Sequence, residues 1–148
     1  MTRLMGIDYG QKRIGLAVCD PSGLVARELA IIHRAGNPQD FGQINRHAQE
    51  QQVTAFVVGL PVNDWPEAGG HDQAKAVRDW VEALKQTTPL PIIFWDEQLT
   101  SVEAREISIR QRRKVRDPID DLAARVMLQS YLDAVRDGLA EPPPNLTP

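Results

Sequence analysis

The chain has 148 residues, of which 42% are hydrophobic and 25% are charged, proportions that are ordinary for one globular domain. Its formal net charge of −3 argues against nucleic-acid binding through bulk positive charge, although it allows a local basic patch. The single cysteine, Cys19, excludes an internal disulfide framework and a thiolate zinc cluster. Apolar runs are shorter than the ~20 residues of a membrane span, and the first residues lack a signal peptide's apolar stretch. We therefore expect a cytoplasmic protein without membrane contact.

Three short strands are predicted first, at Leu4–Tyr9, Ile14–Cys19 and Leu24–Ile32. A turn separates each strand from the next, and Asp20-Pro21-Ser22-Gly23 has the residue order of a type I turn. Strands joined by such short connections pair antiparallel, so the sequence predicts a three-stranded meander.

The pattern then changes to alternating helices and strands. Asn37-Pro38 predicts an N-cap and the first position of a helix that ends near Gln51. Residues 53–60 are almost continuously apolar, which is typical of a parallel strand buried on both faces. The further elements expected are a loop at 61–70, a helix marked by Ala74, Val77, Val81 and Leu84, a strand at Pro91–Trp95, a helix that opens at the capping box Thr100-Ser101-Val102-Glu103, and a last helix from Asp117-Pro118 to about Asp137, with Gly138 as its stop.

This order of elements is that of an RNase H-like α/β fold: three antiparallel strands, then β-α-β-α crossovers, then a final helix. We expect a five-stranded mixed sheet of spatial order 3-2-1-4-5, with helices on both faces because crossover connections are right-handed. One such domain would occupy residues 1–138. The proline-rich residues 139–148 would form a disordered tail.

Two carboxylates near strand ends are candidates for chemistry. Asp8 lies in the predicted central strand, where an unpaired carboxylate is costly. Glu97, preceded by Asp96, follows the fifth strand at its carboxyl end, where open α/β sheets bind ligands. Neighbouring strand residues point to opposite faces, so one of these two acids can face a given site. Each candidate also has a plain structural interpretation: Asp8 as a turn cap or a partner of Lys12 or Arg13, and Glu97 as an exposed strand end.

A third carboxylate, Asp120, stands out on a helical wheel drawn at 100° per residue. It falls near the middle of an apolar arc, while Asp121 falls at the edge of that arc with Arg125 four residues on for a surface pair. The helix dipole explains an acid in the first turn but does not explain its place among apolar side chains. The arc consists of Ile119, Ala123, Ala124, Val126, Met127 and Tyr131, and its two alanines would let the helix approach the sheet closely.

These three carboxylates would converge at one edge of the predicted sheet. Asp8, Glu97 and Asp120 would repel each other unless cations neutralised them. Carboxylate oxygens suit Mg²⁺ or Mn²⁺, and two such ions ~3.5–4 Å apart catalyse phosphodiester hydrolysis. We therefore expect a two-metal nuclease in which one ion activates the water and the other stabilises the leaving 3′ oxygen.

Two basic segments are candidate substrate contacts. The turn that carries Gly10, Lys12 and Arg13 follows Asp8 and could hold a phosphate, with a solvated turn as the alternative. The segment 110–116 is rich in arginine and lysine, and we expect nucleic-acid contacts from Arg112, Arg113 and Lys114. The three histidines, His33, His47 and His71, show no metal-ligand spacing and are interpreted as ordinary residues.

Four segments carry a family resemblance: GIDYGQKRIGLAVCD, VVGLP, DEQLTS and IDDLAARVMLQSYLD. Together they resemble the YqgF family, also called RuvX, from residue 5 to about residue 133. The resemblance implies an RNase H-like fold, a cytoplasmic location, likeness to RuvC-type Holliday-junction resolvases and a role in maturing the 5′ end of 16S rRNA. It also implies that Asp8, Glu97 and Asp120 form the acidic triad.

The chain departs from the family pattern at three places. Gln98 stands where members usually have an arginine, and residues 62–70 replace a short Asn/Asp/Gly loop. Asp121 occupies a position that is commonly small in the family, which invites a mistaken assignment of the helix acid. The first two departures affect substrate preference more than the reaction.

The sequence leaves three functions open. The first is a nuclease that acts on structured RNA, with pre-16S rRNA as the substrate that the resemblance implies. The second is resolution of four-way DNA junctions, which would favour a two-fold dimer, although the sequence fits a monomer or a homodimer. The third is a non-catalytic ribosome-assembly or regulatory factor that merely retains the acids.

Overall fold

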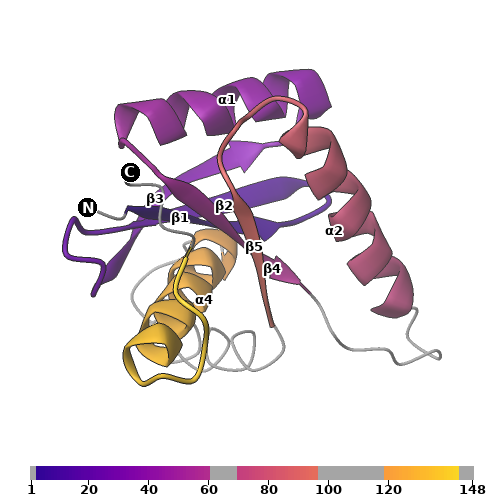
Figure 1. Cartoon of the computed structure of the whole chain (residues 1–148). Helices are drawn as coiled ribbons and strands as arrows, with labels where there is room; N and C mark the ends of the chain where they lie inside the picture. The colour runs from indigo at the N-terminus through magenta and orange to yellow at the C-terminus, as the bar shows by residue number, and fades with distance from the viewer. Residues whose placement is uncertain (1–2, 61–69, 97–118, 144–148) are drawn as a thin grey trace, which may run out of the picture.

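The computed structural model describes residues 3–60, 70–96 and 119–143, with the backbone alone at 70–73, 96 and 119–121. Figure 1 shows its strands in one sheet with the helices packed beside it. The elements are β1 (Leu4–Tyr9), β2 (Arg13–Cys19), β3 (Ala26–His33), α1 (Asn37–Glu50), β4 (Ala55–Leu60), α2 (Gly70–Lys85), β5 (Ile92–Asp96) and α4 (Ile119–Arg136).

The five strands form one mixed sheet in the order β3-β2-β1-β4-β5, as predicted. Within it, β1 and β3 flank β2 in antiparallel pairings, whereas β4 pairs parallel with β1 and with β5. Helices α1 and α2 cover one face of the sheet and α4 covers the other (Figure 1). The predicted RNase H-like arrangement of the described elements is therefore confirmed.

The alternation of β1 divides the interior into two cores. Met5 and Ile7 pack toward α1 and α2, whereas Leu4 packs toward α4, because successive strand residues point to opposite faces. Cys19 belongs to the α4 side and is fully buried, as the sequence predicted, and this burial raises the pKa of its thiol. Asp8 continues the series that begins at Leu4, so it lies on the face that α4 covers.

The start of β3 differs from the sequence prediction. The strand begins at Ala26, because the N–H groups of Leu24 and Val25 donate to the Asp20 carboxylate at 3.0 and 3.1 Å. The Ser22 hydroxyl donates to the same carboxylate at 2.6 Å, and these hydrogen bonds lower the pKa of Asp20. The tight turn itself is as expected, with the Gly23 N–H bonded to the Asp20 carbonyl at 2.9 Å.

The start of α1 also differs. Gly36, at φ 137°, is the N-cap, and no side chain caps the helix. Asn37 is already helical, and its side-chain oxygen accepts a hydrogen bond from Arg34 at 2.9 Å. The prediction of Asn37 as N-cap was therefore wrong, because the neighbouring guanidinium occupies the amide oxygen. At the other end of the chain, Gly138, at φ 76°, directly follows α4 in the stop position that the sequence predicted, just after Asp137.

Helix α4 lies unusually close to β1, and a glycine makes this approach possible. A Cβ atom placed on Gly6 would lie 2.9 Å from the Leu128 Cβ and 3.2 Å from the Ala124 carbonyl oxygen. Ala124 is fully buried, as expected for a small residue at a helix–sheet contact. The pair Gly6 and Ala124 therefore sets the separation between the helix and the sheet.

We predict that Gly6→Ala lowers the free energy of unfolding by ~1–3 kcal/mol, because the added methyl group would meet backbone and Cβ atoms that cannot rotate away. Urea denaturation of the purified variants measures the change. Gly42→Ala in α1 is the control, because a Cβ there meets nothing within 4 Å and alanine favours the helix. Equal stability of the two variants would contradict this account of the α4 contact.

Candidate active site

Asp8 lies near the carboxyl end of β1 and is 9% exposed. Its partner in the neighbouring strand β2 is Gly15. On the other side, Ile7 pairs with Val58, so the next residue of β4, Gly59, is level with Asp8. Neither flanking glycine contributes a side chain that could cover the carboxylate. The carboxylate of Asp8 is therefore flanked in the sheet by glycine on both neighbouring strands.

The contacts between α4 and β3 give the direction of the helix. Gln129 accepts a hydrogen bond from the N–H of Ala26 at 2.8 Å, at the beginning of β3. Arg125, one turn earlier in α4, lies 3.8 Å from the carboxylate of Glu28, further along β3. Helix α4 and strand β3 therefore run in opposite directions, and the start of α4 lies near the end of β3.

That end of β3 is also the edge that carries Asp8. His33, the last residue of β3, is opposite Arg13, and Asp8 is opposite Gly15, two residues from Arg13. The first turn of α4, which includes position 120, thus begins at the same edge of the sheet. The backbone brings the helix start and the strand end together, while the side chains at 119–121 lie outside the described part of the structure.

The helical wheel needs a correction. The sheet-facing side of α4 includes Leu128 and Leu132, which the predicted arc left out, whereas Val126 packs with Leu122 in a separate cluster. The arc was wrong because it merged two apolar sides of the helix. On the corrected wheel, positions 120 and 121 both lie within the sheet-facing side, one toward each of its edges, so the wheel alone does not distinguish them.

The turn between β1 and β2 carries the next candidates. A side chain at Gly10 would collide with the carbonyl oxygen of Arg13, so the shape of the turn itself demands glycine. Lys12 is exposed, and Arg13 begins β2 half-buried, directly opposite His33. The structure thus brings Lys12 and Arg13 to the same edge as Asp8.

Arg34 is a structural residue of this edge that sequence reasoning missed. Its guanidinium donates to the Gly10 carbonyl at 3.4 Å and to Asp40 at 3.3 Å, and it lies 4.9 Å above the Tyr9 ring. Its backbone N–H donates to the Lys12 carbonyl at 2.9 Å. One residue therefore ties two carbonyl groups of the turn to the start of α1. Two basic residues that follow a strand in the sequence, His33 and Arg34, gave no signal that one of them would turn inward.

Asp40 is the other buried carboxylate among the described residues, with no exposed side-chain surface. Besides Arg34, it accepts the backbone N–H of Ala35 at 3.0 Å. Burial disfavours the charged guanidinium, but hydrogen bonds to Tyr9 and Asp40 outweigh that effect and raise the pKa of Arg34. Asp40 therefore has a structural role that its contacts explain.

Several predicted site residues lie outside the described ranges. They include Glu97 and the basic residues Arg112, Arg113 and Lys114. Among the side chains that the structure describes, no three histidine, cysteine, aspartate or glutamate residues are grouped so that they could hold a metal ion. The helices of the described ranges include none long and apolar enough to cross a membrane.

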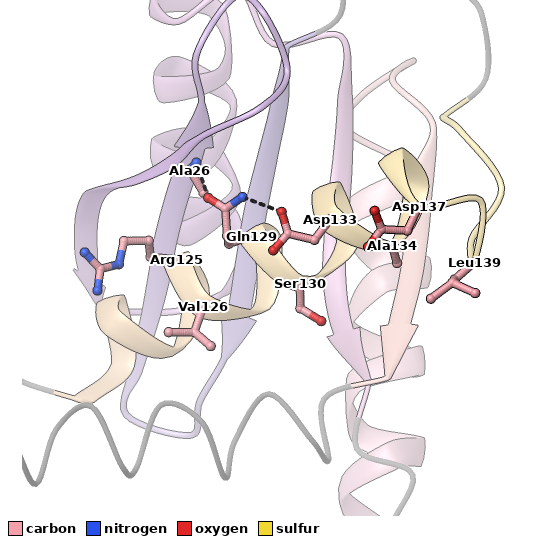
Figure 2. Close-up of a pocket in the computed structure, with 9 residues that line it drawn as sticks. All are labelled: Ala26, Arg125, Val126, Gln129, Ser130, Asp133, Ala134, Asp137 and Leu139. Atoms are coloured by element: carbon pink, nitrogen blue, oxygen red, sulfur yellow. Dashed lines mark hydrogen bonds between the residues drawn. The ribbon is translucent and has the colours of Figure 1, made fainter.

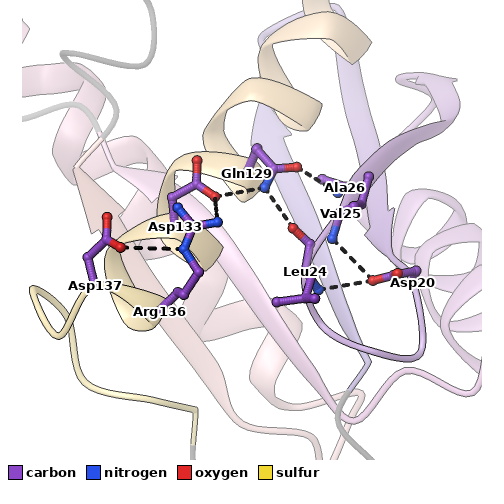
Figure 3. Close-up of polar contacts among 8 residues, drawn as sticks. All are labelled: Asp20, Leu24, Val25, Ala26, Gln129, Asp133, Arg136 and Asp137. Atoms are coloured by element: carbon purple, nitrogen blue, oxygen red, sulfur yellow. Dashed lines mark hydrogen bonds and ion pairs between the residues drawn. The ribbon is translucent and has the colours of Figure 1, made fainter.

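A pocket of about 520 Å³ lies along α4, away from the Asp8 edge (Figure 2). Gln129 lines it and fixes the β2–β3 hairpin to the helix, because its amide donates to the Leu24 carbonyl at 2.9 Å and to Asp133 at 3.0 Å (Figure 3). Gln129 and Asp133, two polar residues of the pocket lining, thus form hydrogen bonds within the protein. The lining consists of Ala26, Arg125, Val126, Gln129, Ser130, Asp133, Ala134, Asp137 and Leu139.

Comparison with known proteins gives the family. The model of the RuvX family, described as "Holliday junction resolvase", matches residues 2–134. The chain belongs to the RuvX family. Two relatives, both named "Putative pre-16S rRNA nuclease", are similar over nearly their whole length. The one from Thermoanaerobacter pseudethanolicus is 42% identical over 139 residues, 91% of this chain and 99% of the relative. The one from Synechocystis is 39% identical over 145 residues, 96% of this chain and 94% of the relative.

Solved structures agree on the fold. This RuvX-family chain is similar to Thermus thermophilus RuvC in complex with Holliday junction substrate, with a TM-score of 0.67, 14% identity and coverage of 96% of this chain and 99% of that one. It is also similar to the fowlpox virus resolvase in complex with Holliday junction DNA, with a TM-score of 0.51, 12% identity and coverage of 90% and 99%. The family model and the relatives' names are those of nucleases, and the solved structures show the shared fold.

We predict that Arg34→Met lowers the free energy of unfolding by ~3 kcal/mol, because it leaves the fully buried Asp40 without its cation. Thermal and urea denaturation measure the change. Lys85→Met is the matched control, since it breaks an exposed ion pair with Glu82 and should cost no more than ~0.5 kcal/mol. If both substitutions had the same small effect, the Arg34 contacts would not hold the turn in place.

Proposed function

We propose that this RuvX-family nuclease hydrolyses phosphodiester bonds in structured RNA with the help of divalent metal ions, and that it processes the 5′ end of pre-16S rRNA. The observation that carries the proposal is the buried carboxylate of Asp8 between Gly15 and Gly59, at the edge where α4 begins. The names of relatives at 42% and 39% identity support RNA as the substrate.

The chemistry of Asp8 fits a hard cation. Carboxylate oxygens are the preferred ligands of Mg²⁺ and Mn²⁺, and Asp8 lies near the carboxyl end of β1, at the edge of the sheet where α4 begins. We propose that Glu97 and Asp120 supply the other carboxylates and that two ions bind. The ions, when bound, would supply an activated water and stabilise the charge of the leaving oxygen.

Strand alternation supports Glu97. Trp95 lies on the α4 face, because its indole N–H donates to the Ser130 hydroxyl at 3.3 Å and its ring packs against Tyr131 at 5.3 Å. Side chains two residues apart in a strand share a face. Glu97 stands two residues after Trp95 in the sequence, whereas Asp96 is out of step with it.

The strands that the two sides of α4 contact support Asp120 over Asp121. Position 120 is ~20° from Met127 and from Tyr131 on the wheel, and these residues pack toward β1 and β5. Position 121 is ~40° from Arg125, which contacts β3. Leu128, ~20° from position 121, also contacts β1 at Gly6, so contact with β1 does not separate the two acids. The Tyr131 side faces β5, the strand that precedes Glu97, so Asp120 is the better candidate.

The chain's own residues have separate tasks in this proposal. Asp8, Glu97 and Asp120 hold the ions in place, and the buried position of Asp8 keeps its carboxylate fixed before the substrate arrives. Lys12 and Arg13, on the turn that Arg34 clamps, neutralise a phosphate of the bound strand. Arg112, Arg113 and Lys114 add further backbone contacts.

Resolution of four-way DNA junctions is the second candidate, because the family model bears the description "Holliday junction resolvase". Junction resolution requires paired cuts and would favour a two-fold dimer. Purified protein with Mn²⁺ or Mg²⁺ should be tested on precursor 16S rRNA and on a four-way junction in parallel. Cleavage of the junction alone, by a dimer, would decide for the resolvase.

We predict that Asp8→Asn abolishes cleavage of precursor rRNA and keeps the wild-type melting temperature, because it removes a ligand charge without changing the size of the side chain. EDTA should have the same effect on the wild type. Asp79→Asn on the exposed side of α2 is the control and should cleave normally. Cleavage that persists in EDTA would rule out metal dependence.

We predict that Asp120→Asn abolishes cleavage and weakens metal binding, whereas Asp121→Asn retains most activity. Without metal, Asp120→Asn should melt at the same or a higher temperature, because it relieves repulsion among carboxylates. Cleavage rates and melting temperatures without metal, measured side by side, provide the test. An inactive Asp121→Asn beside an active Asp120→Asn would show that the wrong side of α4 was chosen.

A further inference from the structure

Arg13 and His33 form a facing pair at the edge of the sheet. They are directly opposite in the β2–β3 register, so their Cβ atoms are ~4.5–5.5 Å apart. Gly15, two residues from Arg13 and therefore on the same face, is opposite Asp8. Arg13, His33 and Asp8 thus share the α4 face, and the step along β2 from Gly15 to Arg13 is ~6.6 Å.

Basic residues gather around this pair, on the same face of the sheet as the Asp8 carboxylate. His33 and Lys12 are exposed and Arg13 is half-buried. Within β2 and β3 the single acidic residue is Glu28, and it already contacts Arg125 at 3.8 Å. The neighbouring cation, Arg34, is turned to the other face of the sheet, where it binds Asp40. His33 and Lys12 therefore present basic, hydrogen-bonding side chains to solvent next to Arg13 and beside the candidate site.

We propose that His33 and Arg13 together bind the phosphate backbone of the nucleic-acid strand that is cut at Asp8, so that the substrate path extends over the β2–β3 edge. The inference rests on the proposed role of Asp8, because it takes its direction from that residue. His33, which has the ordinary appearance of a strand-end histidine in the sequence, becomes a substrate-binding residue through its register with Arg13.

A phosphate backbone is the occupant that fits this surface. The protein as a whole is acidic, with a net charge of −3, so a polyanion must approach through a local basic surface. The facing pair is close enough for both side chains to contact one phosphate or two adjacent ones. A histidine N–H donates to a phosphate oxygen whether or not the ring is charged.

A charge scan at His33 tests the proposal. The readout is the binding of a fluorescent single-stranded RNA in EDTA, measured by anisotropy across a series of salt concentrations. His33→Lys should tighten binding and make the log–log salt slope steeper by ~0.7, the value for one added phosphate contact on a single strand. His33→Glu should weaken binding several-fold, and Arg13→Ala should make the slope shallower by ~0.7.

Leu24→Lys and Leu24→Glu are the matched controls. Leu24 is 52% exposed at the opposite end of the β2–β3 hairpin, so its variants carry the same new charges on a surface of the same fold. Melting temperatures should remain at the wild-type value for the two His33 variants and the two Leu24 variants. If the Leu24 variants changed the salt slope as much as the His33 variants, binding would respond to net charge alone and the proposed path would be wrong.

An unchanged slope in both His33 variants would overturn the proposal as well. Failure of the catalytic proposal would appear elsewhere, as cleavage by Asp8→Asn or cleavage in EDTA. Because the RNA-binding measurement requires no metal and no cleavage, the two outcomes are distinguishable.

Discussion

The contact between Gly6 and Ala124 is the constraint on which the candidate site depends. It presses α4 against the central strand at a distance that no side chain at residue 6 would allow. Asp8 is two residues further along the same face of β1. A helix held at this distance and running toward the carboxyl end of β1 begins where the strand presents its carboxylate. The position of the first turn of α4, which carries the acid, thus depends on the contact between Gly6 and Ala124, one turn further along the helix.

The two buried aspartates show how the same residue type serves different ends. Asp40 has a cation and a backbone N–H around it, and these contacts connect α1 to the turn after β1. Asp8 has glycines as its neighbours in the sheet and lies near the carboxyl end of β1, the position from which we propose that it binds a cation. The Arg34 clamp nevertheless serves the site, because the turn it holds carries Lys12 and Arg13 and starts two residues after Asp8.

The sequence predicted the order and pairing of the strands because apolar alternation and short turns determine them. The five strands and the helices at 37–50, 70–85 and 119–136 appear within a few residues of their expected bounds. Three features could not be predicted from the sequence, and each has a physical reason. Asp20 takes two N–H groups that strand pairing would otherwise use, Arg34 takes the amide that would cap α1, and the two apolar sides of α4 cannot be separated on a wheel without knowing which strands they meet. Asp8 became a candidate from the sequence because a carboxylate in a central strand is conspicuous, whereas His33 became a candidate only through its register with Arg13.

An acidic protein that cuts a polyanion must separate two kinds of surface at short range. Carboxylates that hold cations have to lie within a few ångströms of the phosphate to be cut, and they repel it until the cations are bound. Basic groups that attract the rest of the strand must stay outside the cluster, or they would displace its ions. In the proposed site, strand geometry would provide this separation: Asp8 and Gly15 form the inner pair of β1 and β2, and Arg13 of β2 with His33 of β3 lies one step further out on the same face. Because glycine stands opposite Asp8, the arginine is displaced by two residues along β2 from the position directly across from the acid.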